Sequence, residues 1–178
     1  MATTFEHVAA LLTAADIKFD PDEDRRMLRT AWMRDDVPVS LIILLYEDGE
    51  LLQLRAPGLL VATDDTKKPL LFRAMLQMAY EIRLVQFEYD PGDGEVSTCI
   101  DIALEDAQLT SDQLLRCASL LLDVSFIARD RLKTILETGR DPALESAGID
   151  KQEAAQRQSQ LDAMMELARL MKNTRGDA

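Results

Sequence analysis

The sequence contains little of the chemistry on which most catalytic and metal sites depend. Its 178 residues include one histidine, His7, and two cysteines, Cys99 and Cys117. The cysteines show no CxxC spacing, and no second histidine is available to complete a zinc set. We therefore expect no metal site, no cofactor and no Ser/His/Asp or Cys/His nucleophile. The seven glycines form no phosphate-binding loop.

A basic surplus, a long apolar run and an export signal are also missing. The 20 Lys and Arg stand against 32 Asp and Glu, a net charge of −12. A field of that sign repels phosphate backbones and anionic lipid, so we expect neither nucleic acid nor a membrane as partner. The charge either serves solubility alone or favours a basic or mixed-charge protein partner. No apolar run is long enough to span a bilayer, and no signal pattern is visible, which predicts a cytoplasmic protein.

Hydrophobic periodicity predicts an α+β fold with an antiparallel sheet of about five strands and helices packed on it. The order is helix, three strands, helix, two strands, long helix, followed by a C-terminal amphipathic helix. The expected helices span 4–15, 70–83 and 111–137, and the expected strands span 26–34, 39–46, 51–56, 85–89 and 95–102. We expect residues 20–24 to form an acidic loop and strand 39–46 to be buried on both faces. The dipeptide Pro57-Gly58 is expected to end the third strand.

Two helices carry more apolar surface than one covered side requires. The helix at 111–137 has so wide an apolar arc that it lies deep against the sheet or is covered by a second subunit. We expect domain 1–139 to be followed by a linker and an amphipathic helix in 140–178, at about 151–172. The apolar stripe of that last helix consists of Leu161, Met164, Met165, Ala168 and Met171. This stripe must pack on its own domain, on a dimer mate or on another partner.

The stretch 70–137 carries a resemblance to a known family. It reads LLFRAMLQMAYEI, then VQFEYDPGDGEVSTCIDIAL, then LTSDQLLRCASLLLDVSFIARDRLKTIL. This helix, hairpin and long-helix order resembles the YbjN family of bacterial sensory transduction regulators, over about 5–138. It is also similar to the type III secretion chaperone fold. The resemblance implies homodimers and a protein-binding or regulatory role without an active site, and such chaperones bind extended segments of their clients.

The sequence therefore favours a non-catalytic protein-binding module, chaperone-like or regulatory, that acts as a homodimer. It would hold a protein segment at a sheet edge and an apolar groove. We expect Trp32, Leu52 and Leu54 to line that groove, with the C-terminal stripe as a further contact. One alternative is a structural or regulatory subunit that assembles through its C-terminal helix. Another is a carboxylate-based enzyme, which would need two acids brought together in one pocket.

Overall fold

The structure, a computed structural model, describes residues 2–34 and 36–145. By its internal contacts the chain divides into two units, 1–139 and 140–178. The C-terminal helix expected at 151–172, with its stripe Leu161, Met164, Met165, Ala168 and Met171, lies outside the described residues. The first unit contains all the elements that follow.

The expected order of elements is confirmed, with one additional strand. The elements are α1 (Phe5–Ala14), β1 (Asp20–Asp22), β2 (Met27–Arg34), β3 (Val37–Tyr46), the short 3-10 turn η1 (Glu47–Gly49), β4 (Leu51–Val61), α2 (Lys68–Glu81), β5 (Gln86–Tyr89), β6 (Glu95–Ala103) and α3 (Ser111–Thr138). The sheet has six strands because Asp20–Asp22, expected as a loop, pairs with Met27–Arg29 as β1. The fold class is α+β, as predicted.

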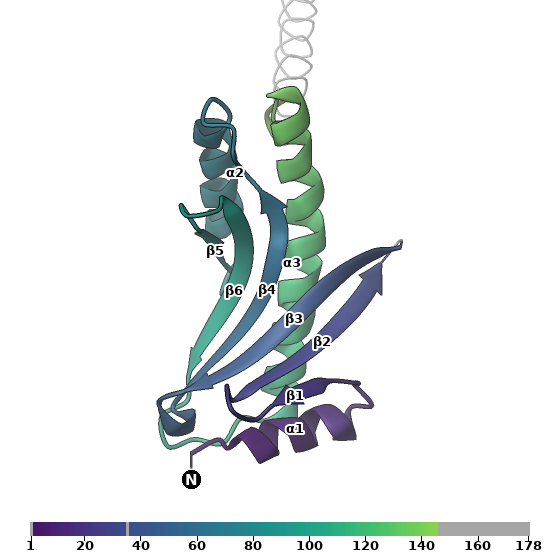
Figure 1. The fold of residues 1–178 in the computed structure, drawn as a ribbon, viewed down its shortest axis with the longest axis vertical. Helices are drawn as coiled ribbons and strands as arrows, with labels where there is room; N and C mark the ends of the chain where they lie inside the picture. The colour runs from purple at the N-terminus through teal and green to yellow at the C-terminus, as the bar shows by residue number, and fades with distance from the viewer. Residues whose placement is uncertain (1, 35, 146–178) are drawn as a thin grey trace, which may run out of the picture. The chain divides into compact units, whose positions relative to one another are not determined.

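The strands form one antiparallel sheet in the order β1-β2-β3-β4-β6-β5 (Figure 1). Short turns join β2, β3 and β4 into a meander, and a second hairpin joins β5 to β6. Helix α2 lies in the connection between the meander and this second hairpin. Strands β1 and β5 form the two edges of the sheet.

Strand β4 continues past the point where the sequence predicted its end. It runs through Pro57 and Gly58, and its register with β6 shifts between Ala56 and Leu60. Gly58 has a φ of +64°, a conformation that glycine adopts without steric penalty. The expectation was wrong because a proline and glycine can be accommodated in an irregular strand as well as in a turn.

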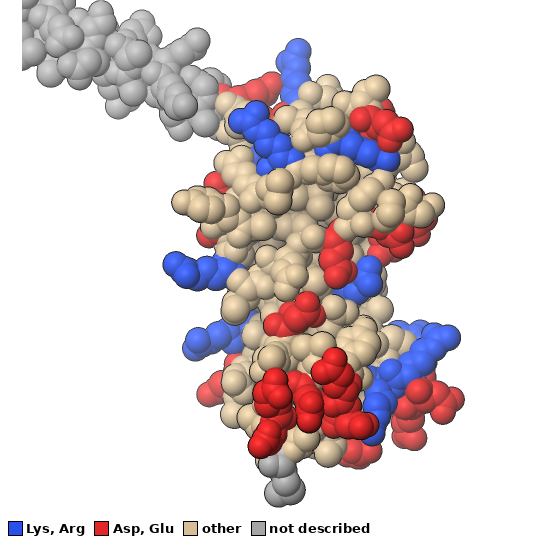
Figure 2. Space-filling model, turned by 90° about the vertical axis from the view of Figure 1, so that its left-hand side faces the viewer, with Lys and Arg blue, Asp and Glu red and all other residues tan. Residues whose placement is uncertain are grey.

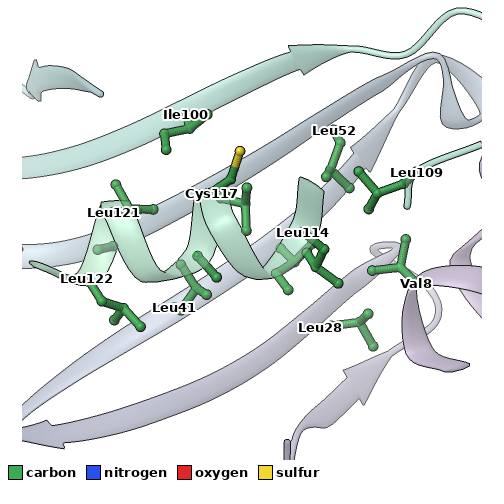
Figure 3. Close-up of a cluster of buried hydrophobic side chains, with 14 of the residues drawn as sticks. Val8, Leu28, Leu41, Leu52, Ile100, Leu109, Leu114, Cys117, Leu121 and Leu122 are labelled. Atoms are coloured by element: carbon green, nitrogen blue, oxygen red, sulfur yellow. The ribbon is translucent and has the colours of Figure 1, made fainter. Parts of the chain in front are cut away.

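The core consists of two clusters of buried side chains on the helical side of the sheet. The first joins α1, the first half of α3 and the faces of β2, β3 and β4 that these helices cover (Figure 3). The second joins α2 and the later part of α3 to the end of β4. In α3, Leu114, Leu121 and Leu132 are all fully buried. The apolar arc of α3 is therefore covered largely within the chain, which favours the first of the two interpretations given above.

Strand β3 does not bury both faces, contrary to the expectation. Val39, Leu41, Ile43 and Leu45 are buried, whereas the residues between them are partly or fully exposed. An antiparallel sheet with helices on one side leaves the other side to solvent, and even apolar residues such as Ile42 then face outward.

Candidate protein-binding surface

The outer edge of β2 is only half covered by a neighbouring strand. Strand β1 pairs with Met27–Arg29, and within the described residues no strand pairs with the rest of β2 on that side. The amide of Leu45 donates to the carbonyl oxygen of Arg26 at 3.2 Å, which sets the alternation of the β2–β3 ladder. The even-numbered residues of β2 therefore bond to β3, and the odd-numbered ones point away from it. The main-chain groups of Ala31 and Met33 consequently lie on an open edge.

A hollow of about 470 Å³ borders this edge on the solvent side of the sheet. We call it the outer hollow. It is lined by Lys18, Phe19, Asp20, Arg29, Thr30, Ala31, Ser40, Ile42 and Pro57. Its floor is mainly apolar, and two cations and one carboxylate lie around it. The side chain of Ala31 is only a methyl group, so the outer hollow has room for a side chain of a bound partner next to this residue.

A second hollow, of about 230 Å³, borders the same edge on the helical side. We call it the Trp32 hollow. It is lined by Trp32, Met33, Arg34, Ser119, Leu122, Asp123 and Phe126. Trp32 is half-buried and packs against the first core cluster. The guanidinium of Arg34 pairs with Asp123 and lies over the ring of Phe126, 4.6 Å from its centroid, so the far end of β2 is attached to α3.

The other two residues expected to line the groove lie elsewhere. Leu52 and Leu54 are 0% exposed and belong to the first core cluster. A partner at the surface would not touch them. Their alternation with Gln53 and Arg55 predicted the strand correctly, but alternation alone does not show which face the helices cover. Of the three candidates, only Trp32 lies beside the open edge.

A second apolar surface, which the sequence analysis missed, lies between α2 and the edge strand β5. We call it the α2–β5 surface. A groove of about 290 Å³ there is lined by Phe72, Met75, Leu76, Ala79, Phe87 and Tyr89. Leu76 of this lining is 72% exposed, and Tyr80, one helical turn later, is 91% exposed. Figure 2 shows the side of the molecule to which α2 and β5 belong, with acidic side chains gathered at the lower end and uncharged surface between scattered charges above them. Leu76 and Tyr80 lie four residues apart, which places them on one face of the helix, and this spacing was the available signal.

The solvent face of the sheet carries a charged cluster in its middle. The guanidinium of Arg55 lies 3.5 Å from the carboxylate of Glu88 and 3.6 Å from that of Glu95, and it donates to the hydroxyl of Ser97 at 3.1 Å. The buried Cys99 pairs with Arg55 across the strands. Burial, with Glu88 and Asp101 nearby, raises the pKa of Cys99 to about 12. The two acids that converge here are thus ion-paired to an arginine, and the thiol is held in its neutral form.

The one histidine lies far from this cluster. Its Nε2 is 2.8 Å from the carbonyl oxygen of Leu109, so His7 connects α1 to the segment before α3. Across residues 2–34 and 36–145, no group of three or more His, Cys, Asp or Glu side chains is placed to hold a metal ion. In the same part of the chain, no helix combines the length and apolar character needed to cross a bilayer.

These features define a small α+β domain with a half-open sheet edge. The profile of the YbjN family, whose description reads "Putative bacterial sensory transduction regulator", matches residues 4–124. The chain belongs to this family. No curated protein matches the sequence.

Solved structures share the fold. YbjN from E. coli has a TM-score of 0.51 and 9% identity, covering 71% of this chain and 94% of that one. A chain of the ExsC–ExsE complex has a TM-score of 0.50 and 22% identity, covering 74% and 97%. A chain of the HopA1–SchA chaperone–effector complex has a TM-score of 0.49 and 18% identity, covering 68% and 88%. The predicted resemblance to the YbjN family and to the type III secretion chaperone fold is confirmed.

Proposed function

We propose that this protein holds an extended segment of another protein by strand addition to the open edge of β2. The observation that carries the proposal is the outward direction of the Ala31 and Met33 main-chain groups between two hollows on opposite faces of the sheet. Main-chain hydrogen bonds supply affinity in this mode of recognition, and side-chain pockets on alternate sides supply selectivity.

The two hollows match the alternation of an added strand. Successive side chains of a strand point to opposite faces of the sheet. A partner residue opposite Trp32 would enter the Trp32 hollow, and a residue opposite Ala31 would enter the outer hollow. The mainly apolar floor of the outer hollow favours an apolar side chain opposite Ala31. The Trp32 hollow is mixed, with the rings of Trp32 and Phe126 beside the ion pair of Arg34 with Asp123, and its rings favour a side chain with an apolar body opposite Trp32.

The fold and the charge support a role in protein binding. A chain of the same fold occurs in the complex of ExsC with ExsE. The net charge of −12 favours a basic or mixed-charge partner through faster encounter. The ion-paired state of Glu88 and Glu95 with Arg55 supports a non-catalytic role. A cytoplasmic location is part of the same proposal.

Proline at the outward positions of β2 tests the proposal. Ala31→Pro removes an N–H that points away from β3, so the β2–β3 ladder stays intact while the open edge loses a donor. Proteins captured from native cytoplasm would be tiled as synthetic peptides, and their binding measured by fluorescence anisotropy. We expect Ala31→Pro to weaken binding about tenfold or more. Ala31→Ser, which keeps the N–H, is the matched control.

Hydrogen exchange gives an independent readout of the same contact. On binding, the amides of Ala31 and Met33 should gain protection, whereas those of Thr30 and Trp32, already bonded to β3, should change little. Peptides that bind Ala31→Pro and the wild-type protein equally well would exclude the β2 edge as the binding site.

We further propose that the protein is a homodimer joined at the α2–β5 surface. This surface combines an apolar groove with an unpaired sheet edge, so two copies related by a two-fold axis could pair their β5 strands and bury Leu76 and Tyr80. The β2 edges, at the opposite end of the strand order, would stay free for the partner segment.

Sedimentation equilibrium tests the dimer. Leu76→Lys combined with Tyr80→Lys should convert dimer into monomer, because each places a charge in an apolar interface. Ile127→Lys is the matched control, since Ile127 is a similarly exposed apolar residue on α3. A wild-type protein that is monomeric at all concentrations, or dimers that survive the double substitution, would contradict the proposal.

The alternative in which 140–178 drives assembly makes a different prediction. Removal of residues 140–178 should then abolish self-association while the peptide affinity of the β2 edge stays unchanged. If the α2–β5 surface joins the copies, the truncated chain should remain a dimer.

A further inference from the structure

Strand β1 covers half of the edge to which the proposed partner binds. The outward-pointing residues of β2 are Met27, Arg29, Ala31 and Met33. The first two pair with Asp22 and Asp20 of β1, respectively. A partner strand that uses the whole length of β2 must therefore take the place of β1.

Strand β1 is held more weakly than the other strands. None of its three side chains is buried, and only Asp20 and Asp22 face β2 with their main-chain groups, because Pro21 lies opposite the inward-bonded Leu28. Besides the ladder, its contacts centre on Asp22, whose carboxylate accepts from Arg29 Nη2 at 3.3 Å and from the amide of Arg25 at 3.1 Å. An exposed ion pair of this kind adds little stability.

The chain on either side of β1 is fixed more firmly. Before the strand, the hydroxyl of Thr30 donates to the carbonyl oxygen of Lys18 at 2.7 Å. After it, Arg26 has a φ of +49° and its carbonyl oxygen accepts from Leu45, so the chain enters β2 at a defined residue. The segment between Phe19 and Arg25 could therefore leave the edge without disturbing β2.

We propose that β1 is an intramolecular strap that occupies the partner's edge, and that the partner replaces it in the same register. This inference rests on the proposed function. The strap runs antiparallel to β2, and the partner would do the same.

The register specifies the chemistry of the partner segment. A residue opposite Trp32 has an apolar body, because it lies against the rings of Trp32 and Phe126 in the Trp32 hollow. Five residues later, opposite Met27, the segment carries a carboxylate that takes over the contact of Asp22 with Arg29. On the same face of an antiparallel pair, such a diagonal contact lies within reach of a long side chain. The recognised class is therefore an extended segment with an acid five positions after an apolar residue.

Synthetic peptides of about eight residues, enough to span β2, test this inference. The probe is a fluorescein-labelled peptide of alternating Thr and Val with Leu in the second position and Asp in the seventh. The comparison peptide has Lys in the seventh position. Binding to the full chain is measured by fluorescence anisotropy for the wild-type protein, Asp22→Asn, Asp24→Asn and Ala31→Pro.

The strap predicts a specific order of affinities. Asp22→Asn weakens the contact of the strap with Arg29, so the Asp peptide should bind this variant about threefold or more tightly than the wild type. Asp24→Asn removes the same charge from the adjoining turn and should leave the affinity unchanged. The Lys peptide should bind more weakly to every variant, because Arg29 repels it. Ala31→Pro should weaken binding of the Asp peptide.

The outcomes separate the two proposals. Equal binding of the Asp peptide to the wild type and Asp22→Asn, with Ala31→Pro still inhibitory, would overturn the strap and leave the β2 edge standing. Binding unaffected by Ala31→Pro would overturn strand addition itself. Unchanged circular dichroism and thermal midpoint of Ala31→Pro would show that its effect is not caused by unfolding.

Discussion

The hydroxyl oxygens of Thr98 on β6 and Ser125 on α3 lie 2.7 Å apart in the buried layer between sheet and helix. Ser125 donates to the carbonyl oxygen of Leu121 at 2.6 Å, so Thr98 is the donor in the pair. Both side chains are fully buried. This contact fixes α3 against the sheet by a directional bond within an otherwise apolar packing.

Removal of one partner of this pair should cost more stability than removal of both. Ser125→Ala leaves the Thr98 hydroxyl buried without an acceptor and should reduce the free energy of unfolding by about 1–3 kcal/mol. The double variant Thr98→Val with Ser125→Ala should lose less than the single variant. Urea unfolding measures both, and a double variant less stable than Ser125→Ala would show that the hydroxyl of Thr98 has another partner.

The turn after β3 should tolerate no side chain at Gly49. A Cβ there would lie 1.8 Å from the carbonyl oxygen of Thr3, and the φ is +99°. Gly49→Ala should therefore destabilise the domain by more than about 2 kcal/mol in thermal or urea unfolding. Gly58→Ala is the control: its φ is +64° and nothing lies within 4 Å of the added Cβ, so it should cost only about 1 kcal/mol.

The thiol of Cys99 should be inert in the folded protein. Burial raises the pKa of Cys99 to about 12, whereas the pKa of a thiol in an unfolded chain is about 8.5. The neutral, buried thiol therefore contributes its full stability below about pH 8.5. This contribution is lost as the pH rises toward the raised pKa of the folded protein. Iodoacetamide at mildly alkaline pH should label Cys99 slowly in buffer and rapidly in urea, as followed by mass spectrometry. Rapid labelling of the folded protein would show that the sheet face opens readily.

Because Trp32 is the single tryptophan, its fluorescence reports on the β2 edge. Arg34→Gln removes the ion pair with Asp123 and the contact with the Phe126 ring. The ion pair is exposed, so the unfolding midpoint should change little, but the emission should shift to the red and acrylamide quenching should increase. Arg29→Gln, on the other face of the same strand, should leave the emission unchanged. An unaltered spectrum in Arg34→Gln would mean that the contacts of Arg34 with Asp123 and Phe126 do not shape the Trp32 hollow.

Local sequence signals predicted most of the fold. The bounds of α3 are encoded locally: the hydroxyl of Thr110 accepts from the amide of Gln113 at its start, and Gly139 ends it with a φ of +71°. Turn residues and hydrophobic periodicity placed the ends of the other long elements within two residues, except for the end of β4 at Val61. These features were predictable because each depends on neighbouring residues or on a repeated contact with a single face.

Features that depend on pairing between distant segments were not predictable. The strand β1 exists because β2 offers it an edge, and nothing in Asp-Pro-Asp favours a strand by itself. For the same reason the sequence identified Leu52 and Leu54 as strand residues but placed them on a groove, when they face α3. Trp32 was placed correctly in a strand, but its position at a half-open edge follows only from the shortness of β1.

The irregularity of β4 at Pro57 and Gly58 separates the two core clusters along a single strand. Leu52 and Leu54 belong to the cluster below α1, and Leu59 belongs to the cluster below α2. Ile82 and Phe87 pack against both clusters, and α3 contributes to both, so the two halves of the core stay joined in spite of the irregular strand. A substitution at either of these two shared side chains would therefore loosen both halves of the core at once.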